Sequence, residues 1–253
     1  MRVLKIGGRA QDDARLAPAV AAAWAAAPGG VVVVHGGGDE VSALQRALGM
    51  EPSFVGGRRV TGARDIDVLR MALSGAANKR LVARLVSCGA RALGLSGEDA
   101  GLIAARPLDD GALGRVGTPE RVDAALLRHL LAGGLLPVVS PLSRDAGQRD
   151  GATLNVNGDD AAAAIAAALG AEELLLVADV PGVLMAGAPV STLDADDALA
   201  AIADGTAAGG MAAKLEAGLA ARRAGVERVR IGDLDAILDP ARGTLLAPTR
   251  SLV

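Results

Sequence analysis

A lysine followed by two glycines ends the first apolar segment of the chain. The segment reads Val3-Leu4-Lys5-Ile6-Gly7-Gly8, and its aliphatic residues predict a strand that contains Lys5. Glycines at the carboxyl end of a strand let backbone N–H groups approach a phosphate, and the ammonium supplies positive charge. The same residues also suit a tight strand-to-helix turn with an incidental lysine. The motif alone leaves both interpretations open.

A second glycine-rich turn follows the apolar run from Val31 to Val34. It reads His35-Gly36-Gly37-Gly38 and leads into Asp39-Glu40, so the glycines lie where a helix presents unpaired N–H donors to an anion. A His-Gly-Gly-Gly turn also forms the oxyanion loop of lipase-like hydrolases. That class needs a Gly-x-Ser-x-Gly elbow, which the sequence lacks. The two commonest nucleotide-binding glycine motifs are absent as well, so a nucleotide would need another architecture.

Two later helix starts carry charged residues. Asn155-Val156-Asn157-Gly158-Asp159-Asp160 precedes an alanine-rich helix, where its side chains can cap the helix and hold a carboxylate in the first turn. Gly209-Gly210-Met211-Ala212-Ala213-Lys214 opens another helix with a lysine about one turn in, which suits a phosphate. Ordinary helix capping and a solvated lysine explain the same segments without any chemistry.

Lysine is rare in this chain. Of its 26 basic residues only three are lysines, Lys5, Lys79 and Lys214. This bias indicates that arginine serves at positions where any positive charge suffices. A lysine in such a chain therefore favours a site that needs a compact ammonium group rather than a planar guanidinium. Chance survival is the alternative for each of them.

Composition excludes several classes of protein. With 253 residues, 51% of them hydrophobic, the chain can bury a large core without disulfides, and Cys88 is its only cysteine, so we expect a cytoplasmic protein. The first residues run directly into a strand, which predicts no targeting segment.

Apolar runs such as Ala161 to Ala171 are too short to span a bilayer. A net charge of -3 and an aromatic content of one Phe and one Trp argue against nucleic acid as a partner.

Short β-branched runs alternate with alanine-rich stretches of helical period, which predicts an α/β fold around a mainly parallel sheet. The expected strands are Val3 to Ile6, Val31 to Val34, Ala90 to Leu95, Leu135 to Val139, Leu174 to Val177 and Val226 to Ile231. The expected helices are Asp12 to Ala27, Asp39 to Leu48, Asp65 to Ser87, Pro119 to Ala132, Asn157 to Leu169, Asp194 to Asp204 and Ala212 to Ala224.

Polar, glycine-bearing inserts at Ser53 to Gly62, Gly97 to Gly117 and Pro181 to Thr192 predict hairpins at the ends of the sheet. Such hairpins can cover a ligand at the carboxyl ends of the strands. We place the boundary between a substrate lobe (residues 1–170) and a nucleotide lobe (residues 171–253) near Gly170.

Taken in order, these segments resemble the amino acid kinase family, and within it most closely the members that phosphorylate N-acetyl-L-glutamate. The matching segments extend over nearly the whole chain. They are Lys5-Ile6-Gly7-Gly8, Val34-His35-Gly36-Gly37-Gly38, Gly57-Arg58-Arg59-Val60-Thr61, Asn78-Lys79-Arg80-Leu81, Gly94-Leu95-Ser96-Gly97-Glu98-Asp99, Leu154-Asn155-Val156-Asn157-Gly158-Asp159, Asp179-Val180-Pro181-Gly182-Val183 and Gly209-Gly210-Met211-x-x-Lys214. The resemblance implies a three-layer α/β/α sandwich and ATP-dependent phosphorylation of the substrate's side-chain carboxylate, in arginine biosynthesis.

The resemblance also implies roles for particular residues. Lys5 and Lys214 would stabilise the phosphoryl group in transfer, with Asp159 orienting both ammonium groups and Gly8 offering a backbone N–H. Substrate contacts would come from Gly37, Gly38, Asn155 and Arg59, which would pair with the α-carboxylate. Nucleotide contacts would come from Asp179, Val180, Pro181, Gly182, Val183, Leu184, Thr206, Ala207 and Ala208. Mg²⁺ would be bound mainly through the ATP phosphates and water, with no metal ligands from the protein.

Two departures from the family bear on assembly and on the site. The chain begins almost at its first strand, without the helix through which arginine-inhibited members form a hexamer, so we expect a homodimer insensitive to arginine, joined through Asp65 to Ser87. Gly158 stands where relatives often have alanine, and we expect it to loosen the helix start by up to about 1 kcal/mol without touching a ligand group. Lys79 receives no role beyond packing near Asn78.

Two alternatives remain open at this point. A kinase for aminoadipate or glutamate attached to an acidic carrier protein would need a basic rim, which Arg58, Arg59 and Arg64 could supply. A non-catalytic amino-acid sensor could keep the same fold. Retention of Lys5, Asp159 and Lys214 together argues against a sensor, because a sensor needs no charge aimed at a transferring phosphate.

Overall fold

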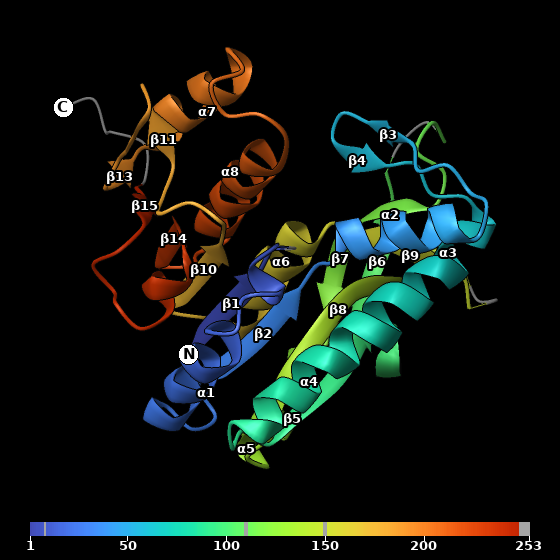
Figure 1. Cartoon of the computed structure of the whole chain (residues 1–253), viewed down its shortest axis with the longest axis horizontal. Coiled ribbons are helices and arrows are strands. Elements are labelled where there is room, and N and C mark those ends of the chain that lie inside the picture. The colour runs from blue at the N-terminus through green and yellow to red at the C-terminus, as the bar shows by residue number, and fades with distance from the viewer. Residues whose placement is uncertain (8, 109–110, 149–150, 248–253) are drawn as a thin grey trace.

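The computed structural model describes residues 1–7, 9–108, 111–148 and 151–247. Within these described residues, the centre is a sheet of 11 strands, shown in Figure 1. The middle of the sheet is parallel, as expected. Its strands, in spatial order, are β14 (Arg228–Gly232), β10 (Glu173–Val177), β1 (Arg2–Ile6), β2 (Val31–His35), β8 (Leu136–Asp145) and β5 (Ala92–Gly97).

Helices cover both faces of this sheet and complete three α/β/α layers. One face carries α5 (Ala124–Ala132), α6 (Gly158–Leu169) and α8 (Gly209–Arg223); the other carries α1 (Leu16–Ala26), α4 (Asn78–Ser87) and the short helix Leu234–Ile237. The side chains of Val31 to Val34 and Leu174 to Val177 have no exposed surface. Continuous apolar runs are what a parallel sheet covered on both faces requires, which is why these runs predicted it.

Antiparallel strands extend both edges of the sheet. β6 (Ile103–Pro107) and β7 (Val116–Val122) form the hairpin expected at 97–117, but they add to the main sheet instead of projecting from it. Three strands were not expected: β9 (Thr153–Val156), β13 (Thr192–Leu193) and β15 (Thr244–Leu246). They are short, and their partners are distant in sequence, so local pattern gives little sign of them.

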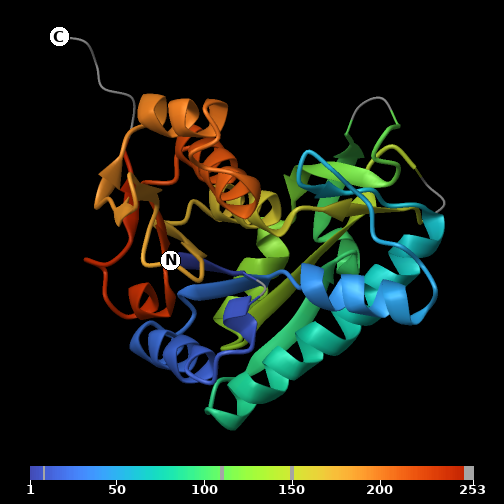
Figure 2. The same ribbon diagram turned by 45° about the horizontal axis from the view of Figure 1, so that its top comes forward.

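The other two expected hairpins stand apart from the main sheet. β3 (Phe54–Val55) pairs with β4 (Arg58–Arg59), and β11 (Leu184–Met185) pairs with β12 (Ala188–Pro189). Figure 2 shows the β3–β4 hairpin on one side of the molecule and α7 (Ala195–Ala203) with α8 on the other, with α6 between them. Among the described residues, no helix is long and apolar enough to cross a membrane.

Two helix predictions differ most from the structure, while α1 begins four residues later and α8 three residues earlier than expected. The helix expected from Pro119 begins only at Ala124, because Asp123 caps it by accepting the N–H of Leu126 at 3.1 Å, while Pro119 lies in β7 opposite Ala105. The helix expected from Asp65 to Ser87 is α3 (Ala63–Leu69), a π-helix (Arg70–Ala77) and α4 in succession. Wider turns of this kind accompany functional sites more often than ordinary helix does, and Asn78 follows this one directly. The helix α2 (Gly38–Ala47) begins at the glycine-rich turn.

Candidate active site

Two ammonium groups and one carboxylate meet at the carboxyl end of the sheet. Lys5 Nζ lies 2.9 Å from Asp159 Oδ1, and Lys214 Nζ lies 3.4 Å from Asp159 Oδ2. The side chains are 8%, 11% and 5% exposed for Lys5, Lys214 and Asp159. The convergence expected of these three residues is therefore present. They come from β1, α6 and α8, which are far apart in sequence.

Local structure explains why each charge points inward. Lys5 is the fourth residue of β1 and pairs in register with Leu176 and Val34, so the buried middle of the sheet carries its stem. Asn157 caps α6 by accepting the N–H of Asp159 at 2.7 Å, which fixes Asp159 in the first helical turn. There the helix dipole favours its negative charge. Lys214 lies in the second turn of α8, which begins at Gly209.

The charges of the three groups depend on one another. Burial alone would raise the pKa of Asp159, but the ammonium groups of Lys5 and Lys214 outweigh burial and lower this pKa below its usual value. Burial, together with repulsion from Lys5, lowers the pKa of Lys214 to about 8, although Asp159 opposes the shift. At neutral pH the cluster holds one net positive charge, ready to stabilise an incoming anion.

A cavity of about 340 Å³ opens beside this cluster toward the β3–β4 hairpin. All the residues that we expected to contact substrate line it, namely Gly37, Gly38, Arg59 and Asn155. Lys5, Asp159 and Lys214 line the same cavity. The structure therefore brings the expected acceptor site and the expected phosphoryl-transfer residues together.

Arg59 is held rigidly at the wall of this cavity. Its Nη2 donates to Gly38 O and to Ser42 Oγ, both at 2.8 Å, and its Nη1 donates to Gln45 Oε1. Its guanidinium also lies 4.7 Å from the centre of the Phe54 ring. These bonds use three of the five N–H donors of an arginine, so the group is preorganised and retains capacity for a carboxylate. Ser42 and Gln45, which support it from α2, gave no signal in the sequence.

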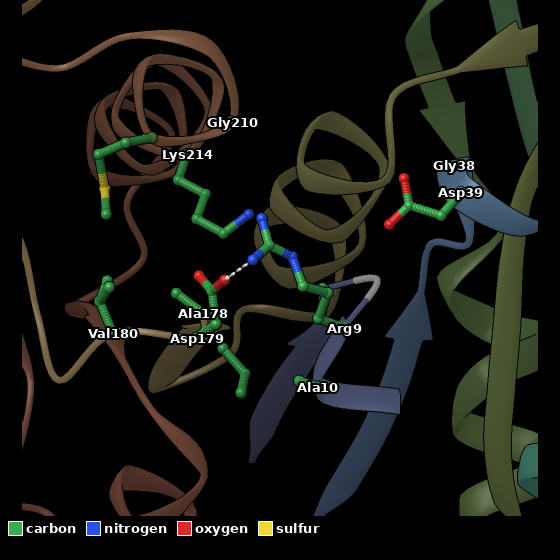
Figure 3. A pocket seen from close by; sticks show the side chains of 12 residues that line it. Arg9, Ala10, Gly38, Asp39, Ala178, Asp179, Val180, Gly210 and Lys214 are labelled. Carbon is green, nitrogen blue, oxygen red and sulfur yellow. Dashed lines mark ion pairs between the residues drawn. The ribbon is translucent and has the colours of Figure 1, made fainter. Parts of the chain in front are cut away.

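A second cavity, of about 470 Å³, adjoins the first and faces the C-terminal part of the chain. Figure 3 shows Arg9 and Asp179 forming an ion pair within it, with Lys214 close by and Asp39 on the opposite wall. The two atoms of this pair, Arg9 Nη1 and Asp179 Oδ2, are 3.2 Å apart. Gly7, Gly38, Gly210 and Lys214 line both cavities. Lys214 thus stands at the junction between them.

The expected nucleotide residues are only partly gathered around the second cavity. Asp179 and Val180 line it, whereas its described lining does not include the segments Pro181 to Leu184 and Thr206 to Ala208. Val183 is buried and donates its N–H to Thr244 Oγ1 at 2.8 Å, and Ala207 is also buried. Gly8 lies outside the described residues. We did not expect Arg9 to line the second cavity, although its position directly after Gly7-Gly8 could have indicated a contact with phosphate.

Gly158 touches the cluster, contrary to our expectation. A Cβ added at this position would lie 3.2 Å from Lys5 Cε, closer than most Cβ contacts. The absence of a side chain therefore gives the Lys5 stem room to cross the first turn of α6.

Sequence comparison places the chain in a family. A model of the amino acid kinase family matches residues 1–233. The chain is a member of the amino acid kinase family. One curated relative of this amino acid kinase is the acetylglutamate kinase of Roseiflexus sp. (strain RS-1), 44% identical over 250 residues, which are 98% of this chain and 94% of the relative.

Solved structures agree with this family assignment. The crystal structure of smu.665 from Streptococcus mutans UA159 matches with a TM-score of 0.87 and 28% identity, covering 97% of this amino acid kinase and 98% of that chain. The N-acetylglutamate synthase of Neisseria gonorrhoeae, complexed with coenzyme A and N-acetyl-glutamate, matches with a TM-score of 0.81 and 26% identity. That match covers 99% of this chain but 60% of the synthase. The three-layer fold expected from the sequence is confirmed.

Proposed function

We propose that this amino acid kinase transfers the γ-phosphoryl group of ATP to the side-chain carboxylate of N-acetyl-L-glutamate, giving ADP and an acyl phosphate in arginine biosynthesis. The observation that carries the proposal is the meeting of Lys5, Lys214 and Asp159 at the junction of two cavities. Two cavities with a shared cationic wall suit two anionic substrates that exchange a phosphoryl group. The curated relative that bears the name acetylglutamate kinase supports the choice of acceptor.

The chemistry needs charge and alignment more than proton transfer. A carboxylate oxygen attacks the γ-phosphorus, the bond from that phosphorus to the β–γ bridging oxygen breaks, and its electron pair leaves on ADP. The nucleophile already lacks a proton, so no general base is required. Lys5 and Lys214 stabilise the charge that spreads over the transferring oxygens, and Asp159 holds both ammonium groups in place. Gly8 adds a backbone N–H in this proposal.

The first cavity takes the acceptor and the second takes the nucleotide. Arg59 pairs with the α-carboxylate of the acceptor, while Asn155, Gly37 and Gly38 complete its site. The nucleotide is bound by residues 179–184 and 206–208. The proposal keeps a substrate lobe (residues 1–170) and a nucleotide lobe (residues 171–253), with Arg9 and Asp39 of the first lobe also lining the nucleotide cavity.

The carboxylates of Asp39 and Asp179 fit a Mg²⁺ ion that is bound mainly through the nucleotide. Among the described residues, no group of three or more His, Cys, Asp or Glu side chains could hold a metal ion by itself. Asp39 and Asp179 line the nucleotide cavity and are the carboxylates that could assist through water. Bound there, Mg²⁺ would neutralise charge on the β- and γ-phosphate oxygens.

We also propose that the enzyme acts in the cytoplasm as a homodimer. The helical segment 63–87 supports an interface, because Met71 and Val86 expose 51% and 52% of their surface on it. Sedimentation velocity tests the interface: we expect a dimer for the wild type and a monomer for the Met71→Asp/Val86→Asp variant. A monomeric wild type would refute it.

A coupled assay of ADP release tests the function. N-acetyl-L-glutamate should support turnover far better than N-acetylaminoadipate, glutamate or aspartate, and hydroxylamine should trap the acyl phosphate. No ADP formation with N-acetyl-L-glutamate would refute the proposal and favour a sensor. A carrier-bound acceptor is disfavoured because Arg58 is paired with Asp160 at 3.1 Å and Arg59 is buried, which leaves little of the basic rim that a carrier would need.

The pH dependence of the reaction should follow Lys214. Its pKa of about 8 means that the ammonium is charged below this pH and loses its proton as the pH rises through it. We expect kcat/KM, which reports on the free enzyme, to fall with rising pH through this value. The Lys214→Arg variant should lack this limb, because a guanidinium does not titrate in this range. A flat profile for the wild type would contradict the prediction.

Arg9 should contribute to nucleotide binding. Its side chain is 81% exposed and paired with Asp179 in the nucleotide cavity, so it can turn to a phosphate at little cost. We expect Arg9→Ala to raise the KM for ATP about tenfold, which corresponds to ~1.4 kcal/mol, with little change in the KM for the acceptor. Arg15→Ala is the matched control, because Arg15 pairs with Asp13 and Asp235 and lines neither cavity. Equal effects of both variants would refute the role.

A further inference from the structure

The carbonyl oxygen of Gly36 lies within hydrogen-bond distance of two side chains that have no role in the proposed mechanism. His35 Nδ1 and Gln11 Nε2 each lie 2.9 Å from Gly36 O. His35 has no exposed surface and Gln11 is 7% exposed. The N–H of Gly36 still bonds to Ile6 O at 3.2 Å, as part of the sheet. The next peptide, between Gly36 and Gly37, is thus the first to leave the sheet, and these two side chains fix its carbonyl.

The hydrogen bonds that lead to His35 have only one possible direction. Lys79 Nζ lies 3.1 Å from both Asn78 Oδ1 and Gly94 O. A lysine ammonium can only donate, so the amide oxygen of Asn78 must face it. The amide nitrogen of Asn78 then lies 3.0 Å from His35 Nε2 and 2.9 Å from Val138 O. Since that nitrogen can only donate, His35 Nε2 must accept.

An imidazole that accepts at Nε2 carries its single proton on Nδ1 when it is neutral. Burial lowers the pKa of His35 to about 4, so the ring is neutral at physiological pH. The Nδ1–H group therefore donates to Gly36 O. The chain runs from an ammonium that can only donate, through Asn78 and His35, to a carbonyl that can only accept. Gly94 leaves the space for it, because a Cβ there would lie 1.9 Å from Asn78 Oδ1.

Peptide geometry carries this constraint into the substrate cavity. In a trans peptide the carbonyl and the following N–H point in opposite directions. With Gly36 O turned toward His35 and Gln11, the N–H of Gly37 is turned away from them. Gly36, Gly37 and Gly38 line the cavity that also contains Lys5 and Lys214. Gly37 has φ of 148°, and a Cβ on it would lie 2.8 Å from Leu73 Cδ2, so any other residue would be strained in this turn.

We propose that Lys79, Asn78, His35 and Gln11 are positioning residues, which hold the Gly36–Gly37 peptide so that the Gly37 N–H donates to the phosphoryl group in transfer. The proposal rests on the proposed function for the identity of that anion. It gives the third lysine of the chain a role: orienting an amide that sets the tautomer of a buried histidine. Stabilisation by a fixed backbone donor costs no reorganisation during the reaction.

Nitrogen NMR on the full chain tests the tautomer without reference to activity. At neutral pH we expect His35 to show a protonated Nδ1 and an unprotonated Nε2. His129 is the chain's other histidine and is exposed, and a His129→Gln variant identifies its signals. An Nε2–H tautomer for His35 would overturn the proposal whether or not the protein is a kinase.

Kinetics test the positioning role. We expect His35→Leu to lower kcat by about 10- to 100-fold with little change in the KM for ATP. This is less than the ~10²- to 10³-fold typical of losing a donor outright, because the Gly37 N–H remains and only its orientation relaxes. His35→Asn places an amide N–H near the position of Nδ1 and should restore most of the loss. Gln11→Met should lower kcat about tenfold.

Gln11→Met keeps the test decisive if His35→Leu fails to fold. Its matched control is Gln148→Met, at an exposed loop residue, which should leave kcat unchanged. Folded Gln11 and His35 variants with wild-type kcat would overturn the proposal. Should the wild type show no turnover with N-acetyl-L-glutamate, the amide signal of Gly37 provides the readout, with inorganic phosphate as the probe. It should shift on adding phosphate to the wild type and shift less in Gln11→Met; equal shifts would refute the role.

Discussion

Replacing Lys214 with arginine should lower kcat by about 10²- to 10³-fold even though the positive charge is kept. Lys214 Nζ is 3.4 Å from each carboxylate oxygen of Asp159, and its side chain is only 11% exposed. A guanidinium is planar and larger than an ammonium, so it cannot occupy the same point between Asp159 and the phosphoryl group. Steady-state kinetics with both substrates at saturation measure the loss.

Arg223→Lys is the matched control for this experiment. It makes the reverse exchange on the same helix, at an exposed position outside both cavities. It should leave kcat unchanged. If Lys214→Arg retains kcat within about twofold of the wild type, the ammonium has no role in transfer, because a lost preorganised donor costs far more.

The largest combined effect on activity and stability is expected from Asp159→Asn. The amide leaves two buried ammonium groups facing each other without a counter-ion, and it no longer orients either of them. We expect kcat to fall by about 10³-fold, since both donors are displaced. Removing one partner of a buried ion pair typically destabilises a protein by ~3–5 kcal/mol.

For Asp159→Asn in this protein, the loss of folding stability should be smaller than this typical range of ~3–5 kcal/mol. The pKa of Lys214 is already about 8, so releasing its proton at neutral pH is inexpensive. One pKa unit corresponds to ~1.4 kcal/mol, and we therefore expect a destabilisation of about 1–3 kcal/mol at pH 7 that shrinks as the pH rises. Urea unfolding at two pH values measures it.

Asp196→Asn provides the comparison for both readouts. Asp196 is an exposed carboxylate in the first turn of α7, so it shares the helix position of Asp159 without the buried partners. Its substitution should leave kcat intact and cost a few tenths of a kcal/mol, up to about 1 kcal/mol, from the helix dipole. A stable Asp159→Asn enzyme with wild-type turnover would remove Asp159 from the mechanism.

Much of the fold was predictable because its strongest signals are local. A strand buried on both faces must be apolar throughout, so Val31 to Val34 and Leu174 to Val177 identify the parallel centre directly. The carboxyl ends of neighbouring parallel strands meet at one edge. Lys5 lies in β1 and the glycines after His35 follow β2, which pairs with β1 in parallel, so two motifs that are visible in the sequence meet at this edge.

The remaining features depend on partners that are distant in sequence. The start of α5 was predicted too early, because Pro119 lies in β7 and pairs with Ala105 of β6, a partner that the local sequence does not reveal. Gly158 could not be connected with Lys5, because their contact joins residues about 150 positions apart. The support of Arg59 by Ser42 and Gln45 has the same origin. Hydrogen bonds of this kind follow no periodicity that a sequence displays.

Lys214 borders both cavities, so an anion arriving in either one increases its affinity for a proton. With a pKa of about 8 in the empty site, part of the Lys214 population is uncharged in mildly alkaline solution. ATP binding then recruits a proton from the solvent, and the measured heat of binding depends on the ionisation enthalpy of the buffer. Lys214 is thus fully protonated only once the substrate has bound.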